Sequence, residues 1–66
     1  MTEKTAKYLA SQYRLCNEDA KNALQGSFRY VARAEAALLM LHAAGYKLDE
    51  QDMLLQKVDG QWISVE

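Results

Sequence analysis

The sequence lacks most of the residues that stabilise very small proteins or carry out their chemistry. Among 66 residues it has no proline, one cysteine (Cys16) and one histidine (His42). One cysteine cannot form an intrachain disulfide, and these two residues alone offer no clustered set of metal ligands. A core of this size rarely supplies more than about 3–5 kcal/mol by itself. We therefore expect a helical unit that is stabilised by self-association or by a partner, with no metal or other cofactor.

Long apolar runs and a strong charge of one sign are also missing. The longest apolar run is 36–41, whereas a membrane span needs about 20 residues. No apolar signal-peptide core follows residues 1–7, which together with the lone cysteine predicts a cytoplasmic protein with no membrane partner. The net charge is −1, but it is +3 over residues 1–33 and −4 over residues 34–66. This asymmetry indicates two complementary halves, or steering of a charged partner.

Three glycines are the only strong breaks in the chain, and the first two bound a predicted helical hairpin. Apolar residues at three- and four-residue steps predict a helix over 3–25, and an alanine-rich stretch predicts a second helix over 28–44. Gly26-Ser27 would end the first helix and cap the second. Residues 17–19 could instead cap a new helix, and that alternative stays open.

The C-terminal third predicts a β-hairpin. Asp59-Gly60 lies between apolar stretches, and this dipeptide suits a two-residue turn with positive φ. Strands over 53–58 and 61–66 would pair Val58 with Gln61 and place one apolar face on the helices, namely Leu54, Val58, Ile63 and Val65. Met53, Leu55 and Trp62 would lie on the other face.

The rival interpretation of this segment is a short helix from Glu50 to Val58 with Asp49 as its cap. We favour the hairpin. The predicted fold is therefore mainly α, in one domain of residues 1–66: an αα-hairpin with a short β-hairpin packed on it.

No catalytic constellation is apparent in the sequence. His42 has no acid or cysteine three or four residues away, and Cys16 lies on an apolar stripe, which is typical of a small buried hydrophobe. The acids Asp49, Glu50 and Asp52 suit a cap or a solvated turn better than paired acid–base chemistry. The glycines lie 19 and 15 residues apart and form no phosphate-binding loop. An enzyme also needs a concave site of about 300 Å³, so we predict no catalytic activity.

Two groups of residues remain as candidate binding sites. From Ala36 to Leu41 the second helix is apolar nearly all round, and tyrosine and tryptophan are usual anchors of protein interfaces. The candidate dimer or partner interface comprises Tyr8, Tyr13, Phe28, Tyr30, Val31, Leu38, Leu41 and Trp62. Basic residues recur on one face of the first helix and again early in the second. The candidate contacts to nucleic acid or to an acidic partner are Lys4, Lys7, Arg14, Lys21, Arg29 and Arg33.

The sequence thus favours a non-enzymatic protein-interaction module that forms a homodimer and binds and modulates or inhibits a larger protein or complex. Chains this small are commonly accessory proteins of phages and other mobile elements, such as antitoxins or anti-CRISPR-like inhibitors of host defence systems. The alternative is a small nucleic-acid-binding transcriptional regulator that uses the basic face of the first helix.

Overall fold

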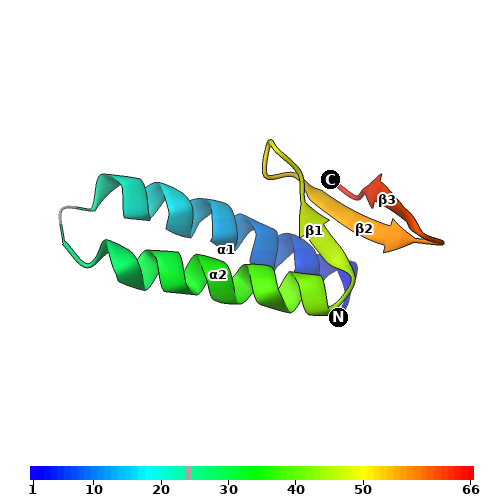
Figure 1. Cartoon of the computed structure of the whole chain (residues 1–66), viewed down its shortest axis with the longest axis horizontal. Helices are drawn as coiled ribbons and strands as arrows, with labels where there is room; N and C mark the ends of the chain where they lie inside the picture. Colours follow the sequence, from blue (N-terminus) through cyan, green and yellow to red (C-terminus); the bar gives the residue numbers. More distant parts are fainter. Residues whose placement is uncertain (24) are drawn as a thin grey trace.

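Two antiparallel helices and a three-stranded sheet make up the protein, as the computed structural model shows (Figure 1). The structure describes residues 1–23 and 25–66. The elements are α1 (Glu3–Asn22), α2 (Ser27–Ala43), β1 (Tyr46–Leu48), β2 (Leu54–Val58) and β3 (Gln61–Ser64). The sheet covers one end of the helical hairpin, and the connection between α1 and α2 lies at the other. The expected helical hairpin with a C-terminal β-hairpin is confirmed.

Helix α1 begins with a side-chain cap. The Thr2 hydroxyl accepts a hydrogen bond from the Thr5 amide at 3.1 Å, which satisfies one of the free donors of the first turn. The helix runs without a break through 17–19, so the alternative of a new helix there is wrong. It ends at Asn22 rather than at residue 25, because Ala23 has extended backbone angles. Of the predicted last turn, residue 24 lies outside the described residues.

Helix α2 starts at a glycine. Gly26 is the N-cap, with φ +73°, a left-handed conformation that costs other residues more. The helix begins at Ser27, so this serine is the first helical residue and not the expected cap. At the other end the chain leaves α2 through Gly45, whose φ is +87°.

The sheet is antiparallel in the order β1-β2-β3. Its β2–β3 register pairs Val58 with Gln61 and Leu55 with Ser64, as the Asp59-Gly60 turn predicted. Both turn residues have positive φ, 51° and 79°. The rival short helix in this segment is therefore wrong. Strand β1 was not predicted, and its three residues pair with β2.

The core lies where the sheet meets the helices. It consists of Leu41, Tyr46 and Leu54 packed with Ala6 and Ala10, and Leu9, Leu48 and Val65 cover its edge. The apolar face of the β-hairpin was predicted to pack on the helices along its whole length. Only its Leu54–Val65 end joins the core, while Val58 and Ile63 remain exposed, since the hairpin projects beyond the helices (Figure 1).

The molecule is longer and exposes more surface than a compact chain of its mass. Its extents are 43 × 20 × 18 Å, and the radius of gyration is 12.4 Å, against about 11 Å for a compact domain of this length. The accessible surface is 4788 Å², against about 4,250 Å² for a typical monomer of 7.5 kDa. The chain alone therefore leaves uncovered a surface that a compact fold would bury.

Candidate interaction surface

An apolar surface runs along α2 and faces solvent. Because a helix turns about 100° per residue, positions 28, 31, 35, 38 and 39 fall within one arc of about 100°. Phe28 is 72% exposed and Leu39 is 68% exposed; Val31 and Glu35 are also exposed, and Leu38 is half-buried. We call this surface the α2 face, and it consists of Phe28, Val31, Glu35, Leu38 and Leu39.

The orientation of α2 follows from its alanines. Ala34 and Ala37 are buried, and Leu41 is buried with them farther along the same helix. Opposite them, α1 buries Ala6, Ala10 and Cys16. Small side chains let two helix backbones approach closely, so the contact between α1 and α2 needs no large residues. Apart from Leu41, the large apolar residues of α2 are therefore left exposed or half-buried.

The structure removes one residue from the predicted interface. Leu41 has no exposed surface, because this chain's own core covers it completely. The sequence pattern placed Leu41 on the same stripe as Phe28, Val31 and Leu38, but α2 is rotated so that Leu41 points inward. Tyr13 and Tyr30 are half-buried.

A second, separate row of apolar residues lies on α1. Tyr8 is exposed and occupies the side of the helix opposite the buried Ala6 and Ala10. Leu15, seven residues after Tyr8 on the same helix, is exposed as well, and so is Met1, which precedes α1. Leu15 was not among the predicted interface residues, although its seven-residue spacing from Tyr8 was the signal that would have found it.

Trp62 lies on the sheet face that also carries Lys47 and Lys57. The ammonium nitrogens of these lysines lie 4.4 Å and 5.9 Å from the centroid of the Trp62 ring. Cations attract the face of an indole ring, so the two lysines partly cover this aromatic side chain. Because these lysines cover part of the ring, the exposure of Trp62 is weaker evidence for a partner than the exposure of Phe28.

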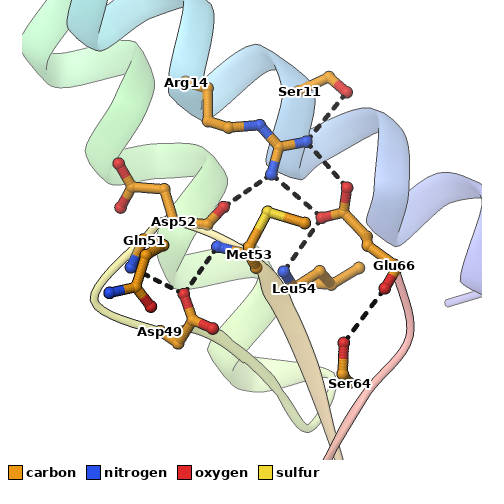
Figure 2. Close-up of polar contacts among 9 residues, drawn as sticks. All are labelled: Ser11, Arg14, Asp49, Gln51, Asp52, Met53, Leu54, Ser64 and Glu66. Atoms are coloured by element: carbon orange, nitrogen blue, oxygen red, sulfur yellow. Dashed lines mark hydrogen bonds and ion pairs between the residues drawn. The ribbon is translucent and has the colours of Figure 1, made fainter.

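Arg14, a predicted nucleic-acid contact, is engaged inside the molecule (Figure 2). Its guanidinium donates to both carboxylate oxygens of Glu66 at 3.0 and 3.1 Å, and to the Asp52 carbonyl at 2.6 Å. Glu66 Oε1 also accepts from the Leu54 amide at 3.0 Å. Arg14–Glu66 is the one ion pair among the described residues. It joins α1 to Glu66, which follows β3, and the Leu54 amide attaches the same carboxylate to the start of β2.

These contacts change the titration of Glu66. The hydrogen bond from Arg14 is the main reason that the pKa of the Glu66 carboxyl lies below its usual value, and the Leu54 amide acts in the same direction. Burial opposes this shift by disfavouring the charged form. The carboxylate is thus held ionised as part of the fold.

The acidic segment after β1 is a turn, one of the two structures predicted for it, and not a helix cap. Asp49 Oδ1 accepts hydrogen bonds from the amides of Gln51 and Met53 at 2.8 and 2.9 Å (Figure 2). Asp52 has φ +60°, a conformation that aspartate tolerates better than most residues. These side chains therefore shape the approach to β2.

The other predicted basic contacts do not gather into one surface. Lys4, Lys7 and Lys21 are exposed on α1, and Arg29 and Arg33 are exposed early in α2. An open hollow of about 470 Å³ beside α1 contains Arg14 and Lys21, but also Glu18 and Asp52. Its mixed charge suits a polyanion poorly.

A second open hollow, of about 350 Å³, lies at the start of α2 and is lined by Phe28, Tyr30, Arg29 and Arg33 among others. Both hollows exceed the volume expected for an enzyme site, but neither encloses a catalytic set such as a nucleophile with a base. Over residues 1–23 and 25–66, no group of histidine, cysteine or acidic residues is arranged to hold a metal ion. Cys16 is buried, and His42 is exposed in the last turn of α2.

Searches against known protein families, curated proteins and solved structures find no match for this chain. None of the helices within the described ranges combines the length and the apolar character needed to cross a bilayer. The functional interpretation therefore depends on the surfaces described above.

Proposed function

We propose that this chain is a non-enzymatic protein-interaction module that binds a larger protein or complex through the α2 face and thereby modulates or inhibits it. The observation that supports this proposal is the exposure of Phe28 and Leu39, 72% and 68%, on one side of a helix whose opposite side holds the fold together. Exposed apolar side chains that gather in one area often mark interaction sites.

The energetics favour a covered α2 face. Full burial of a phenylalanine or leucine side chain contributes about 1.5–3 kcal/mol. The core of a domain this small supplies only about 3–5 kcal/mol. Burial of two such side chains under a partner would therefore contribute a free energy comparable to that of the whole core. The chain also exposes roughly 500 Å² more surface than a typical monomer of its mass, which is more than half of what one partner buries in a standard interface.

The nucleic-acid alternative gains no comparable support. It relied on a basic face of α1, and the guanidinium of Arg14 in the middle of that face is bound to Glu66. No feature of the described residues favours the narrower interpretation, an antitoxin or an inhibitor of a defence system.

The test is a tagged pull-down from a lysate of the natural host, with and without nuclease, followed by mass spectrometry. Wild-type protein is compared with Leu39→Asp and with the matched control Met40→Asp. Met40 is the next residue of α2, is 52% exposed, and lies about 100° away from Leu39 around the helix. The two substitutions therefore introduce the same charge at similarly exposed sites on different faces.

We expect a stoichiometric protein that survives nuclease, is retained by Met40→Asp and is lost with Leu39→Asp. Equal retention by both variants would rule out the α2 face as the binding surface. Partners that disappear with nuclease would instead favour the nucleic-acid alternative.

A further inference from the structure

Glu35 is the only charged residue of the α2 face, and it lies near the middle of that face. It follows Phe28 by seven residues and precedes Leu39 by four. We infer that the partner covers this face with an amphipathic α-helix that carries a lysine or arginine opposite Glu35. This inference rests on the proposed function and adds the chemistry of the partner to it.

The dimensions of the α2 face suit a helix. Leu39 follows Phe28 by eleven positions, which corresponds to about 17 Å along the axis, or about three helical turns. The face is a single strip parallel to α2, with Phe28 at one end and Leu38 and Leu39 toward the other, where the exposed His42 continues the same arc. A partner helix that packs lengthwise on this strip presents its own apolar residues at three- and four-residue steps, in phase with those of α2.

Glu35 decides what the middle of that partner helix must offer. Within residues 1–23 and 25–66 it takes part in no ion pair. An apolar partner that covered Phe28 and Leu39 would also remove water from the Glu35 carboxylate and leave its charge uncompensated, which is costly. A cation opposite Glu35 removes this penalty and forms a charge-assisted hydrogen bond.

A second copy of this chain fits the α2 face less well. If two copies pair antiparallel with Phe28 of each opposite Leu39 of the other, their Glu35 residues come within about 5 Å along the axis. A parallel pair places the two glutamates directly opposite each other. Pairings that separate the carboxylates shift the helices along each other and leave either Phe28 or Leu39 uncovered. Like charges inside an interface disfavour association, so the symmetric dimer is the weaker candidate for this face.

The test uses a displayed library of 15-residue amphipathic helices as the probe. Leucine is fixed at the outer positions of the apolar face, and the middle position is fully randomised. The full-length chain is the bait in three forms: wild type, Glu35→Gln and Glu35→Lys. Leu39→Asp and Met40→Asp serve as surface controls, and far-UV circular dichroism verifies that each form is folded.

We expect lysine and arginine to be enriched about tenfold at the middle position on wild type. This preference disappears on Glu35→Gln and changes to aspartate and glutamate on Glu35→Lys. Binders should be lost on Leu39→Asp and retained on Met40→Asp.

Two outcomes would overturn the inference in distinguishable ways. Binders that require Leu39 but show no basic preference would refute the role of Glu35 and leave the proposed function intact. Binders that ignore Leu39 would refute the α2 face altogether. Sedimentation equilibrium gives a third, independent check: a dimer of the wild type that Leu39→Asp dissociates would identify a second copy as the occupant.

Discussion

The two ends of the helical hairpin are built differently. At the sheet end, Leu41, Tyr46 and Leu54 form a core, and the Arg14–Glu66 ion pair ties α1 to the segment that follows β3. Farther toward the connection between the helices, the buried residues outside this core are all small: Cys16, Ala34 and Ala37. The sheet end therefore carries most of the stability of the fold, while the other part of the hairpin depends on close helix contact and would gain more from a partner.

The largest expected effect is the difference in stability loss between two leucine substitutions on α2. Leu41→Ala should destabilise the protein by about 2–5 kcal/mol, because it removes a fully buried side chain from the core. Leu39→Ala should change stability by less than about 0.5 kcal/mol, since Leu39 faces solvent. Urea unfolding followed by far-UV circular dichroism measures both. Similar losses for the two variants would contradict the division of α2 into an inner and an outer side.

A smaller loss is expected where the helices touch through alanines. Ala34→Leu should cost about 1–3 kcal/mol, because the added atoms force the closely packed helices apart. Ala36→Leu is the matched control, since Ala36 is exposed on the same helix and should tolerate leucine within about 0.5 kcal/mol. The same urea experiment applies. If Ala34→Leu were neutral, close contact would not be what holds this part of the hairpin together.

The smallest effect is a pH dependence at the sheet end. The pKa of Glu66 is lower in the folded protein than in the unfolded chain, so its contribution to stability is complete above the unfolded value of about 4.3. That contribution is lost as the pH falls through the lower, folded pKa. Glu66→Gln has no charge to protonate there, so its stability should fall less than that of wild type between about pH 6 and pH 3. Parallel acid dependences of the two proteins would show that the ion pair with Arg14 adds nothing.

Local patterns in the sequence were sufficient to predict most of the helices and strands, but not how these elements pack together. Helical periodicity located both helices, and the Asp59-Gly60 turn set the strand register because a two-residue turn leaves no freedom in pairing. Strand β1 was missed, since three residues show no periodicity of their own. A stretch that is apolar nearly all round does not indicate which side faces inward, so Leu41 was assigned to the wrong side of α2.

The contact between Arg14 and Glu66 could not be predicted from local sequence patterns for a different reason. Arg14 and Glu66 are 52 positions apart, and only the folded chain brings them together. Arg14 therefore looked like one member of a regular basic row. By contrast, the acidic turn at Asp49 was predictable, because its hydrogen bonds link residues two and four positions apart.

The position of the only tryptophan has an optical consequence. Trp62 lies on the sheet, beside Lys47 of β1, and is not part of the α2 face. Its fluorescence should therefore respond when β1 and β3 separate, and remain nearly constant when a ligand covers α2. Emission from this indole together with far-UV circular dichroism of the helices distinguishes opening of the sheet from events on α2, without any added label.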